Sequence, residues 1–213
     1  MKYIVEVSQI SKFYGKNQVL KGVDLKLSEG KIYGLVGRNG SGKTVLMKCI
    51  CGFIHPEEGK IYVHGKQIGK DVEFAQDIGF IIESPGFLPQ YDAYKNLAYF
   101  YSVKNKIDKE IIEKYIRLVG LNPKDKKKVG KYSMGMKQRL GIAQAIMESP
   151  SLIIVDEPFN GLDISGVEEM RKLFHEMKEE GKTIILVSHN REDINILCDE
   201  VYEMDSGLLS KIR

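Results

Sequence analysis

The sequence predicts an α/β fold with a mainly parallel sheet, an N-terminal antiparallel β-lobe and a helical lobe. Four short apolar runs alternate with helical segments, which is typical of a parallel sheet covered by helices; they are residues 32–36, 78–82, 152–155 and 183–187. Near the N-terminus, short strands follow one another more closely, which indicates an antiparallel ribbon; they are residues 2–8, 19–27 and 60–64. Between the second and third apolar runs the spacing is mostly helical.

These patterns and the length predict one domain with lobes. The chain has 213 residues, enough to bury a full core. Within the domain 1–213, we expect about 1–85 and 150–213 to form a core with the β-lobe, and about 86–149 to form the helical lobe. Asp108 is a good N-cap for a helix in that lobe, and the helix is expected to present one apolar face. That face consists of Ile111, Ile112, Tyr115, Leu118 and Val119.

Composition argues against several classes of function. The 32 basic and 29 acidic residues give a net charge of +3, which does not favour a nucleic-acid partner. Three cysteines, Cys49, Cys51 and Cys198, are expected to be small core residues rather than a metal or redox site. There is no signal peptide and no apolar run near about 18 residues. We therefore expect a cytosolic, soluble protein that reaches a membrane only through a partner.

The most informative stretch is the glycine-rich turn between the strand 32–36 and a helix that begins at Lys43. It fits the phosphate-loop pattern G-x-x-x-x-G-K-[ST] through Gly37, Gly42, Lys43 and Thr44. A triphosphate needs many N–H donors in one concave place, and glycines and a helix N-terminus supply them. Lys43 is expected to reach the β- and γ-phosphates, and Thr44 to hold Mg²⁺. The expected nucleotide-binding residues here are Gly37, Arg38, Asn39, Gly40, Ser41, Gly42, Lys43, Thr44 and Val45.

An acidic pair ends the third apolar run. Asp156 is expected to project from the strand end and hold Mg²⁺ directly or through water. Glu157 can turn to the γ-phosphate side and act as a general base on water. A structural acidic pair would be the better interpretation without the phosphate loop. Because ligands sit at the carboxyl ends of parallel strands, Gly37, Asp156 and His189 are expected to form one site.

A basic stretch precedes the last helix of the helical lobe. It contains Lys124, Lys126, Lys127, Lys128 and Lys131. A solvated connector is the simpler interpretation, and contact with acidic lipid headgroups near a membrane partner is the alternative.

Five motifs in order give the chain a resemblance to the ATPase subunits of ATP-binding cassette (ABC) transporters. They are GRNGSGKT at 37–44, YSMGMKQR at 132–139, LIIVDEP at 152–158, NGLD at 160–163 and SH at 188–189. The second is the discriminating one, and it departs from the family pattern LSGGQ: Ser133 and Gly135 are kept, whereas Tyr132, Met134 and Met136 differ.

The resemblance implies further roles. Tyr14 matches the aromatic residue that stacks on adenine, although a strand-edge aromatic is the alternative. Asp163 matches the loop that links the two sites of a dimer, and His189 matches the histidine that contacts the γ-phosphate. Ser133 and Gly135 match the segment that closes on the γ-phosphate bound to the opposite subunit.

Glu83 stands where most of the family has glutamine. The stretch that follows the second apolar run resembles exporter subunits associated with resistance to bacitracin and lantibiotic-type peptides. A glutamate can still ligate Mg²⁺ through an oxygen, so Glu83 joins Thr44 and Asp156 as an expected metal ligand.

The resemblance implies an ATP-hydrolysing subunit that dimerises on MgATP and drives a separate membrane permease, as an exporter of a peptide, antibiotic or drug. It would be peripheral to the cytoplasmic face of the cell membrane, with ATP and Mg²⁺ as cofactors. The alternative is a non-transport ATPase acting on ribosomes or DNA, but such relatives usually carry two cassettes or long coiled-coil insertions. A nucleotide-binding regulator without turnover is a third possibility, against which Glu157 and His189 argue.

Overall fold

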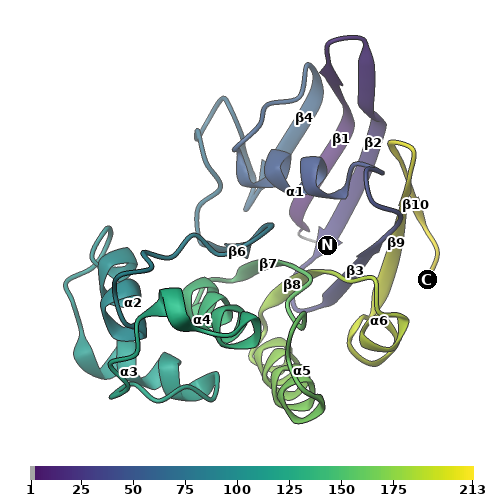
Figure 1. Ribbon diagram of the computed structural model, residues 1–213. Helices are drawn as coiled ribbons and strands as arrows, with labels where there is room; N and C mark the ends of the chain where they lie inside the picture. Colours follow the sequence, from purple (N-terminus) through teal and green to yellow (C-terminus); the bar gives the residue numbers. More distant parts are fainter. Residues whose placement is uncertain (1–2) are drawn as a thin grey trace.

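The computed structural model describes residues 3–213, which form an L-shaped molecule built on two sheets (Figure 1). The first sheet is antiparallel, with strand order β2-β1-β4-β5. Its strands are β1 (Tyr3–Tyr14), β2 (Asn17–Ser28), β4 (Glu58–Val63) and β5 (Lys66–Gln67). It is the predicted β-lobe.

The second sheet has six strands in the order β10-β9-β3-β8-β7-β6, and only β10 runs antiparallel to its neighbour. The strands are β3 (Ile32–Val36), β6 (Ile78–Ile81), β7 (Leu152–Asp156), β8 (Thr183–Val187), β9 (Glu200–Asp205) and β10 (Leu208–Lys211). The predicted α/β fold with a mainly parallel sheet is thus confirmed.

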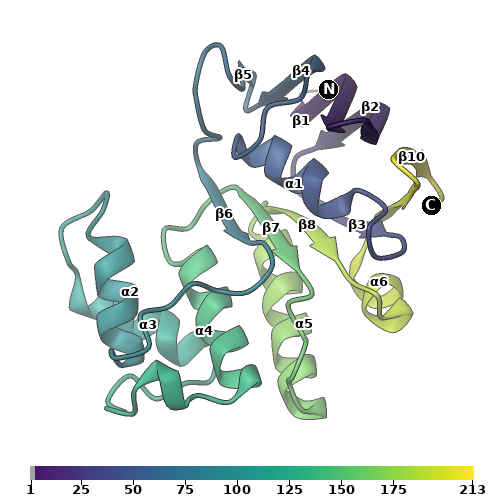
Figure 2. The same cartoon turned by 45° about the horizontal axis from the view of Figure 1, so that its top comes forward.

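The helices either cover the two faces of this second sheet or form the helical lobe beside it (Figure 1). They are α1 (Lys43–Cys51), α2 (Ala93–Tyr101), α3 (Lys109–Leu118), the short 3-10 helix η1 (Val129–Lys131), α4 (Met134–Ile146), α5 (Ile164–Glu179) and α6 (Arg191–Leu197). Figure 2 shows α1 between the two sheets, whereas α2 and α3 lie far from the antiparallel strands.

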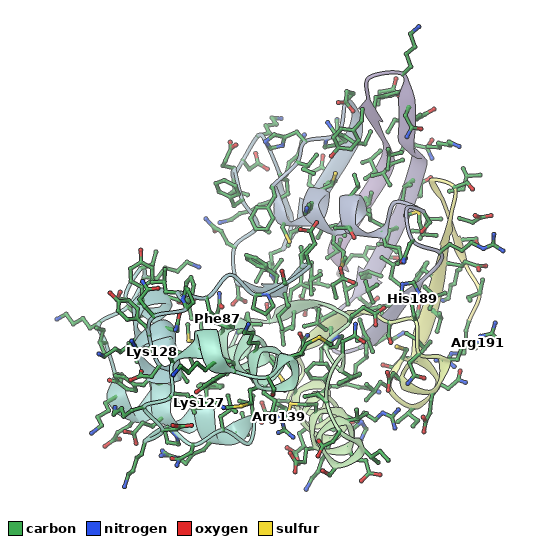
Figure 3. The ribbon with its side chains drawn as sticks, viewed as in Figure 1. Phe87, Lys127, Lys128, Arg139, His189 and Arg191 are labelled. Atoms are coloured by element: carbon green, nitrogen blue, oxygen red, sulfur yellow. The ribbon has the colours of Figure 1, made fainter. Side chains whose placement is uncertain are left out.

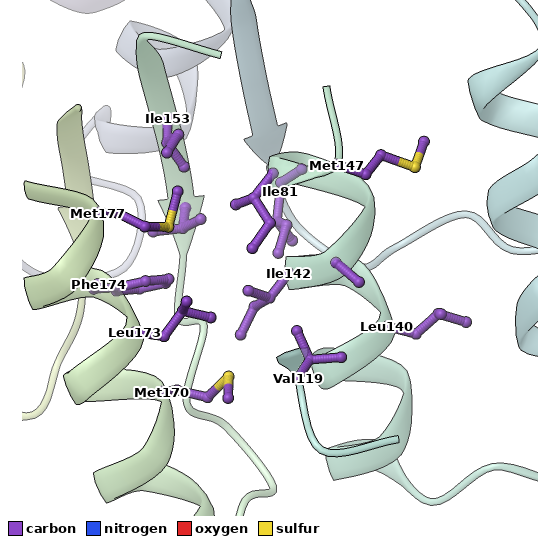
Figure 4. Close-up of a cluster of buried hydrophobic side chains, with 14 of the residues drawn as sticks. Ile81, Val119, Leu140, Ile142, Met147, Ile153, Met170, Leu173, Phe174 and Met177 are labelled. Atoms are coloured by element: carbon purple, nitrogen blue, oxygen red, sulfur yellow. The ribbon is translucent and has the colours of Figure 1, made fainter. Parts of the chain in front are cut away.

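Alternation along the strands divides the core in two. On β7, Leu152 and Ile154 face the α1 side, whereas Ile153 and Val155 face the side of α4 and α5, and all four are fully buried. Figure 4 shows the cluster on the side of α4 and α5, which includes Ile142 of α4 and Phe174 of α5. Burial on both faces explains why these strands read as continuous apolar runs.

Three local expectations need correction. The strand expected at 2–8, whose residue 2 lies outside the described part, continues to Tyr14; Gln9, with φ of 47°, interrupts its register, which hid the continuation. The helical pattern after Ala93 divides into α2 and α3. Asp108 caps α3 as predicted, but Leu118 is 41 % exposed, because the inward face passes through Ile112, Ile116 and Val119.

Candidate functional site

The loop between β3 and α1 is shaped by glycines. Gly37, Gly40 and Gly42 have positive φ values of 141°, 78° and 114°. A Cβ atom on Gly37 would lie 2.1 Å from the carbonyl oxygen of Met204 on β9, so only glycine fits there. The loop therefore turns tightly beside the sheet and leads directly into α1.

Several donors around this loop are available for an anion. Gly42 is the N-cap of α1 and supplies no side-chain cap, so N–H groups of the first turn remain open to a ligand. Lys43 is 7 % exposed, and its Nζ donates to the carbonyl oxygens of Gly37 at 2.7 Å and Arg38 at 2.9 Å. Within residues 3–213, the Ser41 hydroxyl is the only buried side-chain polar atom without a hydrogen-bond partner. These features suit a polyphosphate.

A pocket of about 610 Å³ brings the loop together with the strand ends. Asp156 is the last residue of β7, Glu157 follows it, and His189 lies just beyond β8 (Figure 3). The predicted site residues that line the pocket are Asn39, Gly40, Gly42, Lys43, Thr44, Val45, Glu83, Asp156, Glu157 and His189. Gly37 and Arg38 line an adjacent pocket, which His189 shares.

Glu157 is fixed in an unusual conformation. Its φ of 48° lies in the left-handed region, which is uncommon for a residue other than glycine. Its N–H donates to the carbonyl oxygen of Val187 at 2.9 Å. Its Oε1 accepts a hydrogen bond of 2.8 Å from the N–H of His189, whose ring Nε2 lies 3.7 Å from the same oxygen. The carboxylate is thereby held beside His189 at the pocket.

Burial shifts the ionisation of three groups in the pocket. It is the main cause that raises the pKa of Asp156 and the pKa of Glu157. It also lowers the pKa of Lys43, against the opposing influence of the two carboxylates. All three charges are less well solvated than in water, so a bound cation near the carboxylates and a bound anion near Lys43 would each be stabilised.

Glu83 approaches the pocket from the loop after β6. Its backbone N–H acts on the Asp156 carboxylate in the direction that lowers the pKa of that group, against the larger effect of burial. Its own carboxylate pairs with Lys48 of α1, with 2.6 Å between Oε1 and Nζ. Glu83 therefore lines the pocket while its charge is balanced by a lysine from the helix that begins at the phosphate loop.

The pocket fits Mg²⁺ held together with a nucleotide. Thr44 and Asp156 both line it, and burial leaves the Asp156 carboxylate less well solvated than in water. In the described part of the chain, no group of three or more His, Cys, Asp or Glu side chains could hold a metal alone. Mg²⁺ suits such a place, because it is commonly bound through one or two carboxylates plus substrate phosphates.

Ser41 of the phosphate loop is buried and is not part of the pocket lining, and four predicted site residues outside that loop do not line the pocket either. Ser133 is the N-cap of α4 and accepts a 3.2 Å hydrogen bond from the N–H of Met136, and Gly135 lies in the same helical turn. Asp163 caps α5. Tyr14, at the end of β1, is 51 % exposed, with the Lys12 ammonium 5.6 Å from its ring centre. These four residues therefore do not contribute to the pocket lining of this chain.

Four residues at or beside the pocket were not predicted from the sequence. Val19 and Asn160 line it, Lys48 pairs with Glu83, and Gln138 of α4 donates from Nε2 to the carbonyl oxygen of Glu157 at 3.2 Å. The sequence placed each of them only in a strand, a helix or a motif. Their contacts at the pocket could not be predicted, because these contacts join distant parts of the chain.

The site combines a phosphate loop with one strand that ends in an Asp-Glu pair and another that ends before a histidine. Together with the antiparallel lobe and the added helices, these features define the ATP-binding cassette class. Residues 20–160 match the family described as ABC transporter. The chain belongs to this family, and the protein is an ABC ATPase that binds nucleotide.

Individual relatives give the same assignment. The chain is 44 % identical to an uncharacterized ABC transporter ATP-binding protein, YybJ of Bacillus subtilis, over 97 % of this chain and 94 % of that protein. It is 38 % identical to the bacitracin transport ATP-binding protein BcrA of Enterococcus faecalis (98 % and 68 %). It is 36 % identical to the lantibiotic transport ATP-binding protein SrtF of Streptococcus pyogenes (92 % and 84 %).

Solved structures share the fold. An ATP-binding subunit of an ABC transporter is 26 % identical with a TM-score of 0.88, covering 98 % of this chain and 89 % of that one. A dimeric cassette in a post-hydrolysis state, bound to ADP and Pi, is 23 % identical with a TM-score of 0.86 (98 % and 99 %). Across residues 3–213, none of the helices combines the length and apolar character needed to cross a membrane.

Proposed function

We propose that this chain is the ATP-hydrolysing subunit of an exporter for peptide antibiotics of the bacitracin or lantibiotic kind. The observation that carries the proposal is the convergence of Lys43, Asp156, Glu157 and His189 on one pocket. The names of the relatives BcrA and SrtF support the substrate class. The subunit dimerises on MgATP, drives a separate membrane permease and sits peripherally on the cytoplasmic face of the membrane.

Within the pocket, the residues have distinct roles. Lys43 and the N–H groups of residues 37–45 hold the phosphates. Thr44 and Asp156, with Glu83, hold Mg²⁺, which would neutralise phosphate charge. Glu157 is the general base that takes a proton from the attacking water, and its raised pKa brings it nearer to the ideal for that task. His189 contacts the γ-phosphate and orients the Glu157 carboxylate through its N–H.

Two of the residues outside the pocket, Ser133 and Gly135, serve the partner subunit. Ser133 and Gly135 begin α4, where a hydroxyl and a helix start can attract an anion, so we assign them to the γ-phosphate bound by the second chain. Asp163 links the two sites, and Tyr14 stacks on adenine. The helical lobe, about 86–149, presents Ser133 and Gly135 to the partner, while about 1–85 and 150–213 form the nucleotide-binding core.

The substitution Glu157→Gln tests the proposal. It should keep ATP binding and lower turnover by about 10²–10⁴, or roughly 3–5 kcal/mol of barrier, because the amide cannot accept the proton. The Glu157→Gln protein should also accumulate as an ATP-bound dimer. Phosphate release under saturating MgATP measures the effect, with the exposed Glu168→Gln on α5 as the control. Hydrolysis by the Glu157→Gln protein at the wild-type rate would refute the assignment.

A further inference from the structure

The helix α4 contacts the loop after β7 through one buried polar side chain. Gln138 is 8 % exposed, and its Nε2 donates to the carbonyl oxygen of Glu157 at 3.2 Å. The N–H of Asn160 donates to the same carbonyl, also at 3.2 Å. The carbonyl therefore accepts two hydrogen bonds, one from a side chain that is distant in sequence and one from its own turn.

Glu157 needs such support because its backbone is in the left-handed region. A residue other than glycine keeps this conformation only when its surroundings impose it. Val187 holds the N–H, His189 holds the carboxylate, and Gln138 and Asn160 hold the carbonyl. Among these four contacts, only that of Gln138 comes from a side-chain donor. It can therefore be removed without changing the backbone.

The first turn of α4 also packs closely against the loop after Glu157. A Cβ atom on Gly135 would lie 2.4 Å from the carbonyl oxygen of Gly161, and one on Gly161 would lie 2.8 Å from Cε of Met134. One turn further along α4, Arg139 donates to Glu169 of α5 at 2.8 Å. A displacement at the start of α4 would therefore reach the loop that carries Glu157.

We infer that Gln138 is a positioning residue that sets the orientation of Glu157 and ties it to the helix that begins at Ser133. The inference rests on the proposed role of Glu157 as the general base. Among residues 3–213, the Glu157 carbonyl is the only part of the pocket lining to which the Gln138 side chain donates a hydrogen bond, and Gln138 itself does not line the pocket, so we expect its effect on hydrolysis to act through Glu157.

The test is Gln138→Met in the full chain, because methionine keeps the length and lacks the donor. We expect kcat for MgATP about tenfold lower, equivalent to about 1.4 kcal/mol of barrier, with KM changed less than about twofold. Gln144→Met is the matched control, since it makes the same change on the same helix; its kcat should equal that of the wild type. Wild-type kcat for Gln138→Met would overturn the inference.

A second measurement separates positioning from a merely structural role. In the Glu157→Gln background, Gln138→Met should leave the residual rate unchanged, because there is no base left to orient. A further tenfold fall in that background, or a parallel loss of ATP affinity, would overturn the inference. If Glu157→Gln itself hydrolyses ATP normally, the proposed base is wrong instead. If neither Gln138→Met nor Gln138→Leu folds, Gln138 belongs to the fold and the inference fails.

Discussion

Burial of Asp156 disfavours the charged form of its carboxylate, which is the form that its proposed role at Mg²⁺ requires. The carboxylate is partly buried at the end of β7, which raises its pKa in the folded protein. A raised pKa means that the folded state binds the proton more tightly than the unfolded chain does. Folding stability from this group is therefore fully present at low pH and is lost as pH rises from the unfolded pKa through the folded one.

This sign leads to a prediction for Asp156→Asn. At pH 7–8 the substitution should raise the melting temperature of the ligand-free chain by about 2–4 °C, because it removes a poorly solvated charge and keeps an oxygen acceptor. The gain should disappear at the acidic end of a pH series. Thermal unfolding measures it, with the exposed Asp205→Asn as the control. A lower melting temperature at neutral pH would mean that the charge stabilises the fold.

Two contacts at the residue scale could not have been read from the sequence. Glu83 and Lys48 are 35 positions apart, and Gln138 and Glu157 are 19 apart. Local periodicity carries no information about such pairs, since they depend on how α1 and α4 are placed against the strand ends. The phosphate loop and the Asp-Glu pair could be predicted because the residues that give them their chemistry are consecutive in the sequence.

At the scale of elements, β6 and α4 approach closely at one glycine. A Cβ atom on Gly79 would lie 1.8 Å from the carbonyl oxygen of Ala145, which is a backbone atom of α4. Gly79→Ala should therefore destabilise the protein by about 1–3 kcal/mol or more. Gly86→Ala is the matched control, because nothing lies within 4 Å of its added Cβ. Denaturant unfolding compares the two, and equal stability would show that α4 can move away without cost.

Elements with strict alternation or continuous burial were predicted best. The strands of the parallel sheet came within a residue or two of their expected limits, because burial on both faces leaves a continuous apolar run. β1 was predicted too short, since the bulge at Gln9 breaks the period that defines a strand. α2 and α3 merged in the prediction because both are amphipathic and the break between them has no glycine or proline.

At the scale of the whole molecule, two helix N-termini are suited to bind an anion, and they lie in different places. One begins α1 at the phosphate loop and lines the pocket, and the other begins α4 at Ser133 outside the pocket lining. Within one chain, the start of α4 is therefore not part of the pocket that contains the phosphate loop. In the proposed head-to-tail dimer, each chain would complete the other's site with its own Ser133.

The most direct test of this account is ATP hydrolysis by mixed variants. Lys43→Ala and Ser133→Arg should each be inactive alone. In a mixed dimer both substitutions fall in one site, and the other site keeps an intact Lys43 and an intact Ser133. With random pairing in a 1:1 mixture, about half of the dimers are mixed, so about a quarter of the wild-type rate should return. If tagged pull-down shows mixed dimers but the rate stays at the sum of the separate variants, the shared-site account is contradicted.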